Sequence, residues 1–113
     1  MRKSDKKLDN QLRLTLTNVC ETALKNINGF QWLTHVVNFS DFPTSLKVTC
    51  VFDTNENLDS YIQSASNHYL QSLVKSEFNN IGIKFKNIAN HVSFDTEENC
   101  DKQHNGNWAK RLS

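Results

Sequence analysis

The spacing of apolar residues predicts a long helix near the start of the chain. From Leu8 onward, apolar side chains recur every three or four residues and form one stripe, at positions 8, 12, 16, 19, 20, 23, 24 and 27. Asn28-Gly29 follows, and glycine suits the left-handed position that ends many helices. We predict a helix over 8–27, preceded by a basic, frayed N-terminal tail over 1–7.

A pair of strand patterns comes next. Segment 30–39 is rich in aromatic and β-branched residues, and segment 46–53 alternates between apolar and polar positions. Between them lies the turn 40–45, which holds the only proline of the chain. The pattern predicts an antiparallel hairpin.

The second half of the chain predicts further helices around a second hairpin. A helix over 56–78 buries one apolar stripe, and two short strands, 81–86 and 90–95, then flank a turn. A short helix follows from near Thr96 to Asn105-Gly106, and a last helical turn docks Trp108 and Leu112.

The predicted order of elements is α-ββα-ββα. It indicates an α+β fold in which antiparallel hairpins form one sheet and the helices pack on one face. A length of 113 residues suits a single domain, 1–113.

An acidic phrase occurs twice, as DTNENLD at 53–59 and as DTEENCD at 95–101, each time after a Phe. In both places an expected strand gives way to an expected helix. We interpret Asp53 and Asp95 as helix caps, each with a Glu three residues later that completes a capping box. A calcium loop is an alternative, but both copies lack the glycine and the final glutamate that such loops use. An old internal duplication is the third interpretation.

Composition and charge narrow the classes of partner. The formal net charge is +1, so no overall attraction to nucleic acid or to a membrane surface is expected. No apolar run approaches the length of about 18 residues that indicates a membrane span, and no apolar segment of a secretory signal follows the basic start. The three cysteines lack CxxC spacing, which favours a reducing compartment. We expect a cytoplasmic protein with no membrane partner.

Candidate chemistry is sparse. The sequence has no Walker loop and no GxGxxG, HExxH or GxSxG motif, so we assign no catalytic residue, metal ligand or cofactor. Cys100 and His104 are spaced to share one side of a helix, and a zinc ion there would need further ligands from His91, His35 or Cys50.

Basic residues at both ends of the chain are candidate nucleic-acid contacts: Arg2, Lys3, Lys6, Lys7, Lys110 and Arg111. Lys84 and Lys86 share one face of the expected third strand. Such charges add affinity for phosphate but no sequence specificity, so we expect any binding of nucleic acid to be weak.

Aromatic residues suggest a partner surface on the first hairpin, made of Leu33, Val37, Phe39 and Phe42. Both sides of segment 30–39 are apolar, and helices on one face of the sheet cover only one of them. We expect Trp32 to face the helices with Phe30 and Val36, because its N–H needs a partner when buried. The other side then faces a protein partner or a second copy of the chain.

Five segments, MRKSDKKLDN, FQWLTHVVNFSDFP, VFDTNEN, FDTEENC and NWAKRL, together resemble a group of small bacterial proteins of unknown function. The resemblance runs along nearly the whole chain. Members are sometimes labelled Fis-family transcriptional regulators, which implies a helix-turn-helix reader of DNA. That motif needs two helices joined by about three or four residues. Only TEENCDKQH and NWAKRL offer such spacing, and the first is acidic.

The residues favour a non-catalytic binding or assembly module, with a homodimer as one form and with no small-molecule ligand indicated. A nucleic-acid-associated regulator that uses the basic N-terminal arm is the first alternative. A thiol- or metal-dependent hydrolase built around Cys50, His35 and the acids near Asp53 is the second, so the question of an enzyme stays open.

Overall fold

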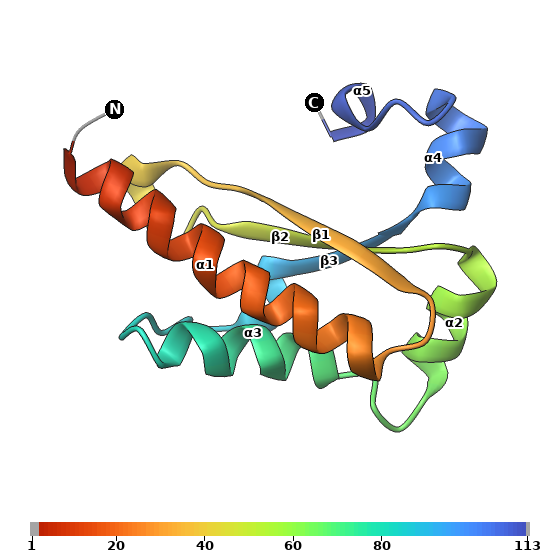
Figure 1. Ribbon diagram of the computed structural model, residues 1–113, viewed down its shortest axis with the longest axis horizontal. Coiled ribbons are helices and arrows are strands. Elements are labelled where there is room, and N and C mark those ends of the chain that lie inside the picture. Colours follow the sequence, from red (N-terminus) through yellow and green to blue (C-terminus); the bar gives the residue numbers. More distant parts are fainter. Residues whose placement is uncertain (1–2, 113) are drawn as a thin grey trace.

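A computed structural model describes residues 3–112 and has an α+β fold (Figure 1). The helices are α1 (Lys3–Asn26), α2 (Asn55–Gln63), α3 (Tyr69–Asn79), α4 (Glu97–His104) and α5 (Trp108–Leu112). The strands are β1 (Phe30–Val36), β2 (Lys47–Phe52) and β3 (Val92–Thr96), and two 3-10 turns are η1 (Phe39–Asp41) and η2 (Ile88–His91). In this part of the chain, no helix is long and apolar enough to cross a membrane.

The sheet is mixed, with strand order β1-β2-β3. The first predicted hairpin is confirmed, because β1 and β2 are antiparallel. The second is wrong, because β3 lies parallel to β2 and segment 81–86 forms no strand. In that segment Ile83 and Phe85 pack against the core. An extended connection that buries alternate residues therefore has the same apolar alternation as a strand.

The predicted helix over 56–78 is also wrong, because it is two helices with a break at 64–68. Ser64 Oγ donates to the carbonyl oxygen of Tyr61 at 2.7 Å, and Asn67 Nδ2 donates to that of Ile62 at 3.1 Å. Serine and asparagine offer the backbone such local bonds in place of helical ones, which explains the break. At the other end of the chain, α1 already begins at Lys3, so the described part of the predicted tail is helical.

The core lies between the sheet and the two helices that cover one face, α1 and α3 (Figure 1). Leu12, Leu16 and Val19 of α1 and Leu70, Val74 and Phe78 of α3 are buried there. On the sheet side they meet Val48, Cys50 and Phe52, the alternate residues of β2. This half of the fold follows directly from the apolar stripes in the sequence.

A bulge in β1 reverses the predicted assignment of faces for the residues that follow Phe30. Phe30 pairs with Phe52 and Trp32 with Val51, so Gln31 is an extra residue between them. Phe30 therefore faces the core, whereas Trp32 faces the opposite side of the sheet. The expectation that both share the helix-covered face is wrong, and Val36 is 59% exposed.

The C-terminal helices cover part of that opposite side. The Nε1 atoms of Trp32 and Trp108 donate to the two carboxylate oxygens of Glu97, at 2.5 and 3.0 Å. The two indoles meet edge to face with centroids 4.8 Å apart. Arg111 holds Asp95 with two hydrogen bonds of 2.6 and 2.8 Å. The expected docking of Trp108 therefore occurs, but on the face away from α1 and α3, whereas Leu112 is 41% exposed and does not dock.

Candidate functional site

The two acidic phrases lie beside each other, because the parallel strands β2 and β3 end at the same edge and each is followed by a helix (Figure 1). Thr54 and Thr96 are the caps. Their Oγ1 atoms accept from the backbone N–H groups of Asn57 at 3.1 Å and Asn99 at 3.0 Å. The prediction that Asp53 and Asp95 are the N-caps is therefore wrong by one residue.

Side chains of one phrase satisfy the backbone and side chains of the other. Glu98 Oε1 accepts from the N–H of Asn55 at 2.9 Å, so this glutamate caps α2 and not its own helix. The Asn55 amide donates to Asn99 Oδ1 at 2.8 Å and accepts from Thr96 Oγ1 at 2.6 Å. The N–H of Glu98 donates to the carbonyl oxygen of Asp53 at 3.1 Å. The two copies of the phrase therefore hydrogen-bond to each other across the junction.

Ligands of α/β proteins commonly bind at the carboxyl ends of parallel strands, but here the chain's own groups fill that position. Asp53 Oδ1 accepts from Thr54 N at 2.6 Å and from Asn57 Nδ2 at 2.9 Å. The hydrogen bond from Asn57 lowers the pKa of Asp53. Within residues 3–112, no group of three or more His, Cys, Asp or Glu side chains could hold a metal ion. Cys100 is fully buried, and His104 Nδ1 lies 3.3 Å from Arg111 Nη1.

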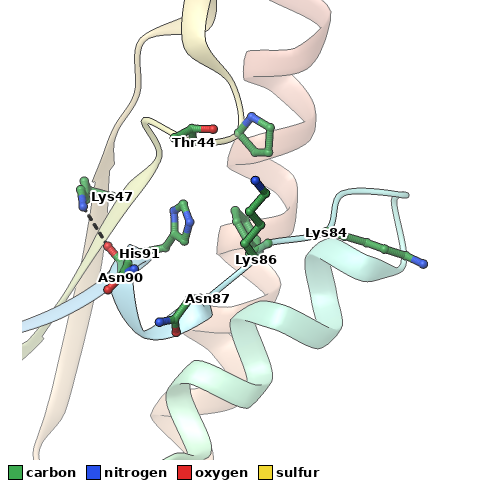
Figure 2. Close-up of a pocket in the computed structure, with 9 residues that line it drawn as sticks. Thr44, Lys47, Lys84, Lys86, Asn87, Asn90 and His91 are labelled. Carbon is green, nitrogen blue, oxygen red and sulfur yellow. Dashed lines mark hydrogen bonds between the residues drawn. The ribbon is translucent and has the colours of Figure 1, made fainter.

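A pocket of about 620 Å³ opens at the other end of β2 (Figure 2). It lies between the β1–β2 connection, where the Phe42-Pro43 peptide is cis, and the connection from α3 to β3. Its lining residues are Pro43, Thr44, Lys47, Lys84, Phe85, Lys86, Asn87, Asn90 and His91. This volume falls within the range of about 300–1,000 Å³ that small-molecule sites commonly have.

Positive charge distinguishes this pocket. Three lysines and a histidine line it, and none of its nine lining residues is acidic. Lys47 Nζ donates to the carbonyl oxygen of Asn90 at 2.8 Å, and Figure 2 shows this ammonium group turned toward Asn90, on the far side of His91 from Lys86. Figure 2 shows Lys86 reaching toward the connection that carries Thr44, whereas the Lys84 ammonium points away from the other labelled side chains. Lys84 also lines a neighbouring pocket with Lys75.

His91 forms the inner wall of the pocket and is 9% exposed. Its Nδ1 lies 2.7 Å from the carbonyl oxygen of Leu46, and its ring packs on Phe85 with centroids 4.5 Å apart. A carbonyl oxygen only accepts, so Nδ1 carries a proton. Nε2 has no hydrogen bond within the described chain, and no buried side-chain nitrogen or oxygen there lacks a partner. The Nε2 atom therefore reaches solvent at the pocket.

Sequence reasoning noted Lys84 and Lys86 but did not join them to Lys47 and His91. The alternation of lysine with Phe85 was the available signal, since it places charged side chains outside a buried ring. What was missing is the path of the chain after α3, which brings this segment beside the start of β2.

The predicted nucleic-acid contacts are divided between two regions. Lys3, Lys6 and Lys7 are exposed on the first turns of α1, in the same half of the molecule as the pocket (Figure 1). Arg111 is bound to Asp95, and its side chain is only 14% exposed. Lys110 is exposed on α5, and Arg2 lies outside the described residues.

The predicted partner surface is half-buried. Leu33, Val37, Phe39 and Phe42 all pack against the core cluster. Leu33 lies on the helix-covered face of β1, and the other three lie in the β1–β2 connection. A partner for these partly buried side chains stays a prediction.

The cysteines are not arranged as nucleophiles. Cys50 is fully buried, and burial raises the pKa of its thiol to about 12. His35 pairs with Val48 in the hairpin, and it shares a groove with Cys20. Burial raises the pKa of Cys20 and lowers that of His35. Both side chains are therefore neutral near pH 7, whereas thiol catalysis uses a thiolate.

No protein-family model, curated protein or solved structure matches this chain. The geometry of the described residues is therefore the basis for a functional proposal.

Proposed function

We propose that this chain is a non-catalytic binding module that takes an anionic ligand in the basic pocket. One observation carries the proposal: Lys47, Lys84, Lys86 and His91 line a single pocket that has no acidic residue. The sequence indicated no small-molecule ligand, and the pocket is the reason for proposing one.

Electrostatics supports an anion as the ligand. A unit charge about 4 Å from an opposite charge gains about 1 kcal/mol in water and about 4 kcal/mol at the effective dielectric constant of a protein surface. Lys47 is already held by Asn90, so less side-chain freedom is lost when it meets a ligand. Exposed lysines are screened by salt over about 8 Å at physiological ionic strength, so binding should weaken as salt rises.

The lining also supports binding over catalysis. It supplies ammonium and amide donors and the imidazole of His91, but neither a cysteine nor a carboxylate. The hydrolase alternative depended on Cys50, and a fully buried thiol with a pKa of about 12 gives that reaction no support.

Sulfate is a suitable probe, because its charge is constant across the neutral range. We expect amide NMR titrations at constant ionic strength and about pH 6 to give a measurable affinity for sulfate. Lys86→Met should weaken it by about tenfold, the equivalent of about 1.4 kcal/mol. Lys25→Met, at an exposed lysine in the last turn of α1, is the matched control and should change it less than about twofold. Equal losses in both variants, or no binding by the wild type, would refute the proposal.

Nucleic acid is a second candidate, favoured by the exposed Lys3, Lys6 and Lys7 in the same half of the molecule. The affinity for mixed-sequence DNA should then depend less steeply on salt after replacement of these three lysines by Met. The slope of the logarithm of the binding constant against the logarithm of the salt concentration should fall in magnitude by about three. Sulfate affinity at the pocket should be unaffected. An unchanged salt slope would remove this arm from any nucleic-acid interface.

A further inference from the structure

We infer that this chain forms a two-fold symmetric dimer in which α1 packs antiparallel to α1 of a second copy, with Thr17 on the symmetry axis. This surface is separate from the basic pocket, because the groove beside Thr17 and the pocket share no lining residue. The inference goes beyond the proposed function and does not depend on it.

The outer side of α1 is open to a partner. Leu14 is 69% exposed and Leu24 is 51% exposed, and both lie on this helix. Thr17 lines a groove of about 490 Å³ between α1 and β1, which is an edge strand of the sheet. Exposed leucines are common on protein surfaces, so the charges around them must decide what partner fits.

The charges on α1 are self-complementary. Residues four apart form one ridge along a helix, and one such ridge consists of Asp9, Arg13, Thr17, Glu21 and Lys25. Its charges run acid, base, neutral, acid, base. Read from the other end, every charge in this series changes sign. A ridge with this property matches a second copy of itself in the antiparallel direction.

An axis through Thr17 sets residues that are equally far from it in sequence against each other. Arg13 then meets Glu21 of the other copy, and Asp9 meets Lys25. Two-fold symmetry makes each contact occur twice. Such ridges run alongside each other when two helices cross at about 50°. The small side chain of Thr17 allows the helices to approach closely at the axis.

The same charges oppose the neighbouring registers. If the axis moves two residues toward the N-terminus, Asp9 meets Glu21 of the other copy. If it moves two residues toward the C-terminus, Arg13 meets Lys25. Like charges set against each other disfavour an arrangement, so the pattern selects the register that is centred on Thr17.

Contacts within one chain prepare this surface. Arg13 Nε donates to Asp9 Oδ2 at 3.0 Å, although the Arg13 side chain is 71% exposed. A guanidinium has five N–H donors, so Arg13 can hold Asp9 and also bind Glu21 of the other copy. Each end of the interface then carries four charges of alternating sign. Single exposed ion pairs contribute little, whereas such a network contributes more.

Charge reversal tests the pairing, with dimerisation measured by sedimentation equilibrium at low salt. Arg13→Glu sets acids against acids, and Glu21→Arg sets bases against bases. Each should weaken dimerisation by about thirtyfold, because two attractive pairs become repulsive. Lys75→Glu makes the same change of charge as Arg13→Glu at an exposed residue of α3 and is the matched control. It should dimerise like the wild type.

A mixture of the two reversed chains tests the register itself. Arg13→Glu chains carry acids at both positions, and Glu21→Arg chains carry bases at both. In the antiparallel register an equimolar mixture regains every opposite-charge pair, so it should dimerise at least as tightly as the wild type. A mixture that stays monomeric, or reversals that leave the wild-type dimer intact, would overturn the inference.

A dilution series of the wild type needs no variant and therefore does not depend on how the substitutions fold. The amide NMR signals that move on dilution should belong to α1 and to the adjacent edge of β1. A wild type that is monomeric at about 1 mM chain, or signals that move only elsewhere, would also overturn the inference.

Discussion

Thr96 and Thr54 occupy the same place in the repeated phrase, but only the Thr96 hydroxyl donates to the other phrase. Thr96 Oγ1 accepts from Asn99 N and also donates to Asn55 Oδ1 at 2.6 Å. Thr54 Oγ1 accepts from Asn57 N, which is the cap bond, and its hydroxyl also interacts with the carboxylate of Asp53, a neighbour in its own phrase. Replacement of each threonine by valine removes the hydroxyl with little change in shape. Comparison of the two variants therefore measures what the junction between the two phrases contributes to the free energy of unfolding.

The expected magnitudes follow from these bonds. Loss of a cap costs about 1 kcal/mol, and an acceptor left without its partner in a partly buried site costs about another 1 kcal/mol or more. Thr96 is fully buried, so water cannot replace its hydroxyl at Asn55. We therefore expect Thr96→Val to lower the free energy of unfolding by about 2–3 kcal/mol and Thr54→Val to lower it by about 1 kcal/mol.

Urea unfolding monitored by circular dichroism measures both changes, provided that the slope with denaturant is unchanged. Thr96→Ser should recover most of the loss, because it restores the hydroxyl. Thr49→Val, which removes an exposed bond to Ser93 on the sheet, is the control and should change stability by less than about 0.5 kcal/mol. Equal losses for Thr54→Val and Thr96→Val would show that the two phrases do not support each other.

Three further predictions concern the rest of the fold. Burial acts to raise the pKa of Asp95, but the hydrogen bonds from Arg111 and Thr96 outweigh burial, so the pKa is lowered. The ionised Asp95 side chain therefore stabilises the folded protein at pH values above the ordinary pKa of about 3.9. This stabilisation is lost as pH falls through the lower pKa of the folded state. Urea midpoints measured from about pH 6 to about pH 2 should show a smaller acid loss in Asp95→Asn, and an identical loss would contradict this account. Cys50 should resist a thiol reagent in the folded protein at about pH 8, since burial raises its pKa to about 12; labelling as fast as in urea would exclude this burial. Val37→Asp should lower the free energy of unfolding by more than about 2 kcal/mol, because Val37 packs against the core. The neighbouring Val36→Asp is the control and should lower it by less than about 0.5 kcal/mol. A stable, monomeric Val37→Asp would show that Val37 lies on an outer face and not in the core.

The local elements near the start of the chain were predictable because each depends on neighbouring residues. The stripe of α1 and the alternation of β2 each place apolar side chains on one face, and the structure buries them there. The cap region was predicted to within one residue, since aspartate and threonine both accept hydrogen bonds from a helix N-terminus. The sequence pattern alone therefore does not distinguish Asp53 from Thr54 as the cap.

The errors arose where distant parts of the chain decide the outcome. The bulge at Gln31 puts Phe30 and Trp32 on opposite faces of the sheet, and a period of two residues cannot reveal an extra residue. The parallel pairing of β3 with β2 joins segments that no local pattern connects. The pocket depends on the same parallel pairing, which brings the residues before β3 beside the start of β2. Lys47 and His91 could therefore not be assigned to one site from the sequence.

The central claim is that an oxyanion binds in the basic pocket beside Lys86, and locating one there tests it most directly. Selenate has the shape and charge of sulfate, and its selenium atom gives an anomalous diffraction signal. In crystals grown near pH 6, the account predicts a selenium peak in the pocket with an oxygen within hydrogen-bond distance of Lys86 Nζ, and loss of that peak in Lys86→Met. Occupied selenate sites confined to other surfaces, such as Lys3, Lys6 and Lys7 of α1, would contradict it.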